Sequence, residues 1–567
     1  MREVGGTGAG GPDGYGYDLG RYTSPVSTAH PEAQRWFDRG LVWTYGFNHG
    51  EAIACFRRAL AVDPDCAMAH WGIAYAAGPN YNMPWALHDD AGRAEALATA
   101  YDATQAALAL RGGLRPEERA LIEALALRYP QRLPSEDMAA WDDAFALGMC
   151  DVLERFPDHL DIRSLAVEAM MTRTPWQMWD PVSGHPGEGA DTLACRAVLE
   201  EAFAHWPEAW SHPGLLHLYV HLMEMSPWPE LALRHGDALR DIAPDAGHLV
   251  HMATHIDVQC GAYQDVVFWN ARAVEADMAY FRREGAFNIY TGYRLHNYHF
   301  AVYGAMLLGQ LAPARAALRG LQETTPEALL RIESPPMADY FEAYLAFEPH
   351  VLVRFGLWEE AVALEPPADG ALYCTRTAFV HYARAVAHAA LGQVAQAEAA
   401  EADFLAAAAR VPESRLVHNN RVVDLLEIAR HMVRGEILYR QGRHEAAFAE
   451  LRRCVVLEDA LAYDEPWGWM QPSRHALGAL LLEQGRLPEA EQVFRADLGL
   501  TGGIPRAQVH PGNVWALRGL HDCLLARGEA LERVHVAAAL ERALARADRA
   551  VAAACFCAGA AQACCPG

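Results

Sequence analysis

Small, aromatic and proline residues recur along this chain with the spacing of paired helices. From Ala33 onward, positions 4, 8, 20, 24, 27 and 32 of a 34-residue unit hold Trp36, Gly40, Ala52, Phe56, Ala59 and Pro64. The small residues would let two helices approach closely, the aromatic ring would fill the space between them, and the proline would end the second helix. Alternating strand patterns are absent. The pattern therefore predicts antiparallel helical hairpins in an all-α fold.

The same unit returns along most of the chain. Further copies begin near Pro213, Gly247, Leu295, Ala378, Ile428 and Gln471, so we expect at least seven repeats. Between residues 79 and 200 the period is blurred and rich in tryptophan, which indicates divergent helical pairs. Residues 530–554 read as a last, capping helix.

This unit resembles the tetratricopeptide repeat (TPR). The resemblance implies a solenoid of stacked helical hairpins that winds as a right-handed superhelix. In such a hairpin the first helix lines the concave groove. Its positions 2, 5, 9 and 12 face the groove because they lie three or four residues apart on one helical face.

The pattern divides the chain into five expected parts. Residues 1–24 are rich in glycine and expected to be disordered, and residues 25–200 hold the first repeat and the divergent helices. Residues 201–320 hold histidine-rich repeats and residues 321–529 the later repeats. Residues 530–567 form the capping helix and a cysteine-rich tail.

Composition and charge exclude several functions. The formal charge is 47 − 72 = −25 and no basic run occurs, which argues against nucleic acid or an anionic membrane as a partner. The chain has no lysine, so it lacks a Walker A lysine, a pyridoxal Schiff base and a lysine general base. Because it also lacks an apolar run of membrane-spanning length and a segment typical of signal peptides, we expect a cytoplasmic protein.

Histidines occupy the groove-facing positions of three successive repeats, which begin at Pro213, Gly247 and Leu295. The side chains at these positions are His217, His221, Glu224, His248, His251, His255, His296 and His299. Two pairs, His217 with His251 and His221 with His255, are 34 residues apart and so fall at equivalent places on neighbouring helices. Since packed helices lie about 10 Å apart, we expect these side chains to meet in one hollow.

Convergent imidazoles favour a metal site. Histidines at i and i+4 can share one ion, and a neighbouring helix can supply a further ligand. Imidazole suits copper, iron and zinc, and we favour copper because imidazoles greatly outnumber carboxylates. Glu168, in a predicted helix, could add a carboxylate. The alternatives are polar groove residues bonded to one another, or a surface that binds a peptide.

Four cysteines gather near the end of the sequence. They are Cys555, Cys557, Cys564 and Cys565, and the first two are separated by one residue. Thiolates at this spacing suit Cu(I) or Zn(II), so Cys555 and Cys557 are candidate metal ligands if the tail folds back into the groove. A tail without a function is the alternative.

Several segments also resemble a group of large bacterial TPR proteins. They include GFNHGEAI, HLYVHLMEMSPWPELAL, GHLVHMATHI, RLHNYHF, YDEPWGW and the terminal CFC. The resemblance implies a shared architecture and supplies no reaction. Peptide-clamping TPR proteins carry Lys, Asn and Arg in the groove where this chain carries histidine.

Three functions follow from these patterns. The favoured one is a metal-dependent enzyme, an oxidoreductase with copper or iron or a hydrolase with zinc, that acts on a small molecule. The second is a scaffold that binds a peptide in the groove. The third is metal storage or delivery through the cysteine tail.

Overall fold

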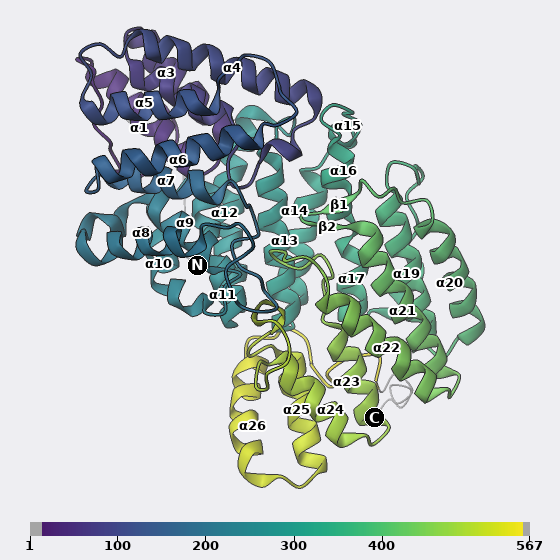
Figure 1. The fold of residues 1–567 in the computed structure, drawn as a ribbon. Coiled ribbons are helices and arrows are strands. Elements are labelled where there is room, and N and C mark those ends of the chain that lie inside the picture. The colour runs from purple at the N-terminus through teal and green to yellow at the C-terminus, as the bar shows by residue number, and fades with distance from the viewer. Residues whose placement is uncertain (1–13, 559–567) are drawn as a thin grey trace.

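Helices make up almost all of the structure. The computed structural model describes residues 14–558, and within them the only strands are β1 (Leu416–Val417) and β2 (Asn420–Arg421), which pair as one antiparallel hairpin. Figure 1 shows the helices stacked side by side in a curved array, from the N-terminal helices in purple to the C-terminal ones in yellow. The predicted all-α fold is confirmed.

Most helices follow one another with short connections, and longer ones occupy residues 172–191, 460–472 and 498–513. The first half of the chain forms α1 (Pro31–Tyr45), α2 (His49–Val62), α3 (Ala67–Ala77), α4 (Asp90–Ala109), α5 (Pro116–Arg128), α6 (Ala139–Arg155), α7 (Leu160–Met171), α8 (Thr192–His205), α9 (Pro213–Met223), α10 (Leu233–Leu239), α11 (Gly247–Cys260), α12 (Tyr263–Glu284) and α13 (Thr291–Leu308). The second half forms α14 (Leu311–Glu323), α15 (Glu327–Leu330), α16 (Met337–Phe341), α17 (Phe347–Arg354), α18 (Trp358–Ala363), α19 (Cys374–Ala390), α20 (Val394–Ala408), α21 (Val422–Arg440), α22 (His444–Asp459), α23 (Ser473–Glu483), α24 (Leu487–Asp497), α25 (Val514–Ala526) and α26 (Ala530–Leu544). Short 3₁₀ turns are η1 (Trp85–Leu87), η2 (Pro207–Ser211), η3 (Pro229–Ala232), η4 (Glu342–Ala346) and η5 (Arg506–Gln508).

Consecutive helices pack as hairpins through glycine and aromatic residues at the predicted repeat positions. A Cβ on Gly40 of α1 would lie 2.5 Å from the Phe56 ring of α2, and one on Gly72 of α3 would lie 2.7 Å from the same ring. In the pair α23 and α24, a Cβ on Gly478 would lie 2.6 Å from Phe494. Glycine at these positions lets the helices close onto the ring. The TPR-type array of hairpins is confirmed.

Glycines also cap two of the three helices that carry the candidate site. Gly261 follows α11 and Gly309 follows α13, with φ of +79° and +74°. This left-handed conformation favours glycine, which has no Cβ to clash with the preceding turn. At Gly261 a Cβ would also lie 2.2 Å from the carbonyl oxygen of Pro511.

The start of the described chain differs from the expectation of disorder. Residues 14–24 lie against α1 and α2, and Tyr15 and Leu19 are buried. The Tyr15 hydroxyl donates to Glu51 and accepts from the Trp43 indole, at 2.7 Å in both cases. Aromatic residues within the glycine-rich stretch therefore anchor it. Residues 1–13 lie outside the described part of the chain.

The last helix is shorter than expected. α26 ends at Leu544, and the chain then crosses to α14, where the Asp548 carboxylate accepts the backbone N–H groups of Leu311 and Ala312 at 2.6 and 2.8 Å. A carboxylate at a helix N-terminus satisfies otherwise unpaired donors there. The tail after Asp548 continues over α17, where the Arg354 guanidinium donates to the carbonyl of Ala554 at 3.0 Å.

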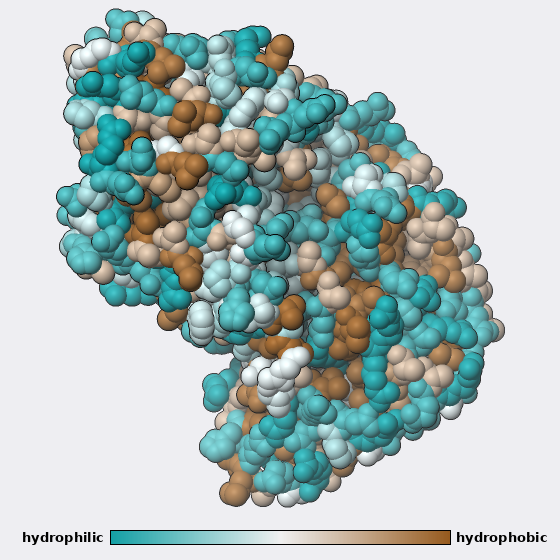
Figure 2. All heavy atoms as spheres, viewed as in Figure 1, coloured by the Kyte–Doolittle hydropathy of each residue, from teal (hydrophilic) through white to brown (hydrophobic). Residues whose placement is uncertain are grey.

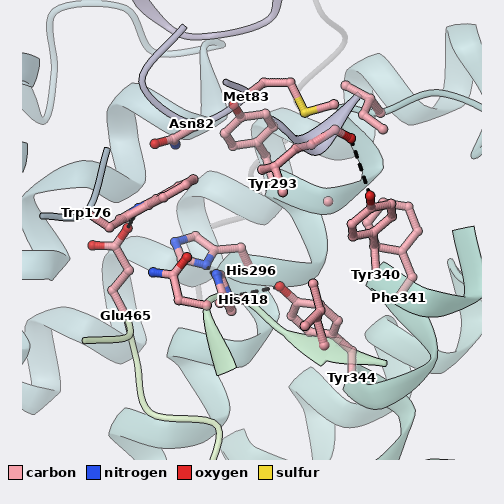
Figure 3. A pocket seen from close by; sticks show the side chains of 15 residues that line it. Asn82, Met83, Trp176, Tyr293, His296, Tyr340, Phe341, Tyr344, His418 and Glu465 are labelled. Atoms are coloured by element: carbon pink, nitrogen blue, oxygen red, sulfur yellow. Dashed lines mark hydrogen bonds between the residues drawn. The ribbon is translucent and has the colours of Figure 1, made fainter. Parts of the chain in front are cut away.

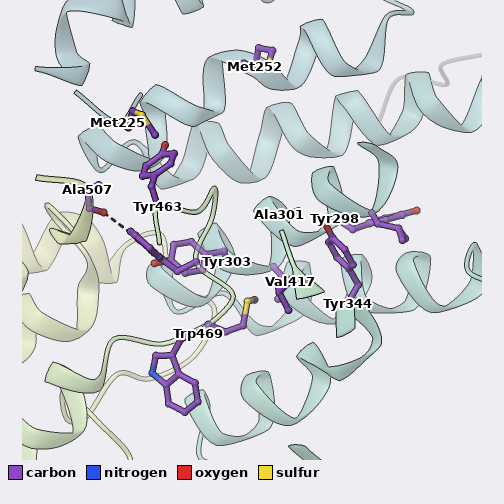
Figure 4. Packing of buried hydrophobic residues seen from close by; sticks show 14 of the residues in the cluster. Met225, Met252, Tyr298, Ala301, Tyr303, Tyr344, Val417, Tyr463, Trp469 and Ala507 are labelled. Carbon is purple, nitrogen blue, oxygen red and sulfur yellow. Dashed lines mark hydrogen bonds between the residues drawn. The ribbon is translucent and has the colours of Figure 1, made fainter. Parts of the chain in front are cut away.

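The interior of the curved array is filled by loops. The segment 460–472, between α22 and α23, is buried from Tyr463 onward, and Trp469 is 1% exposed. Figure 4 shows Tyr463 and Trp469 among buried side chains of other elements, including Tyr303 and Met225. These large aromatic side chains occupy space that an open groove would leave to solvent.

Polar residues cover most of the face in Figure 2, with hydrophobic residues scattered between them. Among helices of the described residues, none has both the length and the apolar character needed to cross a bilayer.

Candidate metal centre

Three neighbouring helices carry the histidines into the interior. α9 packs beside α11, and α11 beside α13. Histidines three or four residues apart share one face of each helix. The result is a continuous cluster of buried imidazoles, in which each side chain is at most 7% exposed.

The first trio consists of His217, His221 and His248. The rings of His217 and His221 have centroids 4.7 Å apart, and those of His217 and His248 lie 4.9 Å apart. Each side chain offers a nitrogen within 4.8 Å of the other two. The Nε2 atoms of all three, and Nδ1 of His248, are buried without a hydrogen-bond partner.

The second trio consists of His251, His255 and His296. The Nε2 atoms of His251 and His255 are 2.7 Å apart, and those of His255 and His296 are 3.4 Å apart. These three residues also offer nitrogens within 4.8 Å of one another. Each trio could therefore hold a metal ion.

The two trios have the same relation to the repeat. Each takes positions 5 and 9 from one helix and position 2 from the next helix in the array. His217 and His221 are joined by His248, and His251 and His255 are joined by His296. The second trio thus repeats the first, one hairpin further along the array.

Hydrogen bonds at Nδ1 orient two rings of the first trio, those of His217 and His221. His217 Nδ1 lies 2.6 Å from the backbone carbonyl oxygen of Tyr45, which can only accept. His221 Nδ1 lies 2.9 Å from Oε1 of Glu224. In a neutral ring that donates from Nδ1, Nε2 carries the lone pair.

The second trio is oriented in the same way. His251 Nδ1 donates to Oδ1 of Asn270 at 2.8 Å; the Asn270 amide nitrogen itself donates to Thr254 and to a backbone carbonyl, which fixes its oxygen as the acceptor. His255 Nδ1 contacts the carboxylates of both Glu224 and Glu465. Nε2 of His251 therefore carries a lone pair, and it faces Nε2 of His255.

His296 completes this arrangement from the third helix. Its Nδ1 lies 3.0 Å from Nε2 of His418, which also forms a hydrogen bond of 2.8 Å with the Tyr344 hydroxyl. Imidazoles that donate one N–H to a carbonyl or carboxylate and turn the other nitrogen inward are the usual arrangement of metal-ligating histidines.

Burial keeps six histidines of this cluster uncharged at neutral pH: His217, His221, His248, His251, His296 and His418. It lowers the pKa of His217 to about 3 and that of His418 to about 4. The pKa values of His221, His248, His251 and His296 are also well below the usual value, first because of burial and then mostly because of neighbouring imidazoles. Neutral imidazole is the form that binds metal.

A pair of carboxyl groups joins the two trios. Glu224 contacts His221 of the first trio and His255 of the second, and Glu465 contacts His255 through Oε2 at 2.9 Å. Burial, and then the charge of Glu465, raise the pKa of Glu224 well above its usual value. His221, Glu224, His255 and Glu465 also offer ligand atoms within 4.8 Å of one another.

A cavity of about 190 Å³ lies beside the second trio. Figure 3 shows His296 and His418 at its inner side, Trp176 and Glu465 next to each other, and Tyr293, Tyr340 and Tyr344 around it. One member of the second trio, His296, lines this cavity.

The structure does not bring every sequence candidate to the trios. His299 stacks on Phe347 with ring centroids 4.3 Å apart, and its Nε2 lies 3.1 Å from the sulfur of Met470. Glu168 accepts from the Tyr75 hydroxyl at 2.7 Å, and burial raises its pKa to about 7.

The tail cysteines that the structure describes line a different cavity from the one beside the second trio. Cys555 and Cys557 form a disulfide and line a small cavity with Arg354, Glu436 and His475. Cys564 and Cys565 lie outside the described residues.

Sequence analysis missed Asn270, His418 and Glu465 as partners of the histidines. Glu465 is 210 residues from His255, and His418 is 122 residues from His296. Neither lies at a groove position of a repeat. The YDEPWGW segment, with two acidic residues among aromatic ones, is the sequence signal that points to Glu465.

The fold and this cluster define the protein's class: a TPR-type array of helical hairpins with buried histidine groups that could hold metal. No family model and no curated protein matches the chain.

Several solved structures are distantly similar to the chain. A structure of a human IFIT1 dimer with m7Gppp-AAAA is 12% identical and matches over 92% of each chain, with a TM-score of 0.31. The Cut9–Hcn1 hetero-tetramer of the APC/C is 14% identical over 90% of this chain and 76% of that chain, with a TM-score of 0.30. A structure of Naa15/Naa10 bound to HypK-THB is 13% identical over 90% and 70%, with a TM-score of 0.22. At these scores the similarities say nothing about function.

Proposed function

We propose that this protein is a metal-dependent oxidoreductase that acts on a small molecule, with one metal ion in each histidine trio. The close approach of His251 and His255 carries the proposal. Nε2 of His251 bears a lone pair, and it lies 2.7 Å from Nε2 of His255. Two nitrogens bound to one ion at about 2.0 Å would be about 2.8 to 3.3 Å apart for bond angles near 90° to 110°.

The buried nitrogens of the first trio support the same conclusion. A buried polar atom without a partner costs about 1 to 3 kcal/mol. Four such atoms lie together on His217, His221 and His248. A metal ion would compensate for this cost by accepting the lone pairs that point inward.

Copper is the favoured metal, and iron or zinc are the alternatives. Each trio consists of imidazoles alone, which suits copper and zinc, whereas non-haem iron commonly uses two histidines and one carboxylate. Glu224 and Glu465 contact Nδ1 atoms of the histidines, so they would orient the ligand rings and would not bind the ion themselves. A copper ion held by either trio would supply redox chemistry, which is why copper favours an oxidoreductase.

Metal content tests the proposal. Protein without a histidine tag, purified with and without oxygen, should contain about two equivalents of metal by elemental analysis. His217→Ala should lose the ion of the first trio, and His251→Ala should lose that of the second. The exposed His205→Ala is the matched control and should retain both.

Other outcomes would favour other functions. Wild-type protein that binds no metal under either condition would refute the metal site and leave the peptide-binding scaffold. Bound metal that does not change its oxidation state with any reductant or oxidant would refute the oxidoreductase and leave a zinc hydrolase or metal storage and delivery.

A further inference from the structure

The cavity beside the second trio has aromatic walls. Trp176, Tyr293, Tyr340, Phe341 and Tyr344 all line it. Their rings come from different parts of the chain and face the same space (Figure 3). Such walls bind flat rings by stacking and cations by the negative faces of the rings.

One acidic side chain, that of Glu465, lies among these aromatic residues. Among the described residues of the lining, Glu465 is the only Asp, Glu or Arg. Its Oε1 accepts from the Trp176 indole at 3.2 Å, while its Oε2 contacts His255 of the second trio. A ligand next to Trp176 would therefore also be next to a carboxylate.

Two residues of the lining have an unusual backbone. Trp176 and His418 have φ of +54° and +48°, in the left-handed region that large side chains rarely adopt. The Trp176 backbone N–H donates to the Tyr81 hydroxyl at 3.1 Å, which holds this conformation. Backbone conformations of this kind cluster at ligand sites, where they position a side chain.

We propose that the cavity binds a small aromatic amine in its ammonium form, as the substrate of the oxidoreductase inferred above. That the ligand is a substrate rests on the proposed function; that it binds in the cavity does not. The ammonium group would lie between Glu465 and the face of Trp176. The aromatic ring of the ligand would lie among the tyrosines, and His296 would connect the ligand to the second trio.

The lining argues against other ligand classes. A carboxylate or phosphate would meet Glu465 without a cationic partner, since no arginine lines the cavity among the described residues and the chain has no lysine. An alkylammonium ion without a ring would lose the stacking contacts with the walls.

Binding to the metal-free protein tests the inference separately from the metal. Calorimetry with phenethylammonium, 3-phenylpropionate and n-butylammonium as probes should give at least tenfold tighter binding of phenethylammonium than of either other probe. Equal or tighter binding of 3-phenylpropionate, or no binding of phenethylammonium, would overturn the inference. Neither result would depend on whether the trios hold metal.

Two variants locate the binding site. Glu465→Gln should reduce the preference for phenethylammonium over 3-phenylpropionate to less than about threefold, and Trp176→Ala should weaken phenethylammonium binding at least tenfold. Trp228→Ala, an exposed tryptophan away from the cavity lining, is the matched control and should bind as the wild type does. Unchanged binding by both Glu465→Gln and Trp176→Ala would place the amine elsewhere and contradict the inference.

Discussion

At the scale of single residues, the state of each imidazole depends on what its Nδ1 atom contacts. Asn270, on α12, accepts from His251 and is itself held by Thr254. Without Asn270, His251 could turn or donate from its other nitrogen. Partners of this kind typically change metal affinity about 10- to 100-fold when they are removed.

Asn270→Ala should therefore weaken metal binding at the second trio about 10- to 100-fold and leave the first trio unchanged. Competition titration with a chelator of known affinity measures both sites. Asn288→Ala, in the loop before α13, is the control and should bind as the wild type does. Equal weakening of both sites, or of neither, would contradict the role given to Asn270.

His350 illustrates how buried histidines make stability depend on pH. It lies on α17 against Phe379 and Trp469, and burial lowers its pKa to about 3. Below about pH 6.5 the unfolded chain binds a proton at this residue and the folded protein does not. Each such histidine therefore removes up to about 1.4 kcal/mol of stability per pH unit as the pH falls from 6.5 toward 3.

Replacing this residue should make the protein less sensitive to acid. In His350→Leu, the free energy of unfolding should fall less steeply between pH 6 and pH 4, by up to one proton, or about 1.4 kcal/mol per pH unit. Urea unfolding of the metal-free protein at several pH values measures the slope. A slope equal to that of the wild type would show that His350 takes up its proton while the protein is folded.

At the scale of the elements, the repeat explains both the hairpins and the paired trios. The period put His217 and His251, and likewise His221 and His255, at equivalent places on α9 and α11, and the structure joins each pair to a histidine at position 2 of the next helix. The series stops at α13. There, position 5 is His299, which packs against Phe347, and position 9 is Tyr303, which bonds to His510.

The glycines between hairpin helices carry a prediction about stability. Gly478→Ala would put a Cβ 2.6 Å from the Phe494 ring, so it should destabilise the protein by about 1 to 3 kcal/mol through overpacking. Gly112→Ala, in a turn with no atom within 4 Å of the added Cβ, should change stability by less than about 0.5 kcal/mol. Thermal unfolding of both variants measures the difference, and similar effects would mean that the hairpin relaxes around the new methyl group.

At the scale of the whole molecule, the C-terminal tail and the histidines lie in different parts of the array. Cys555 and Cys557 pack near Arg354 and His475, and His475 is bonded to Asp497 and not to a trio. The tail is thus placed to hold α17, α21 and α23 together. Its backbone supports this role, since Arg440 of α21 donates to the carbonyl of Cys557.

Removal of this disulfide should therefore leave the metal centre intact. The double variant Cys555→Ser and Cys557→Ser should keep the wild-type metal content by elemental analysis, because neither described cysteine of the tail belongs to a group that could hold the ion. A loss of one equivalent or more would instead assign the tail a part in binding or delivering metal.

The sequence by itself determined the helices, their pairing and the faces on which the histidines lie, because helical period and repeat length are local properties. Only the tertiary structure decided which imidazole nitrogens are free, that Glu465 and His418 join the cluster, and that loops fill the groove and leave one aromatic cavity. These features depend on residues more than a hundred positions apart, whose meeting is set by the packing of the whole array and leaves no periodic signal in the chain.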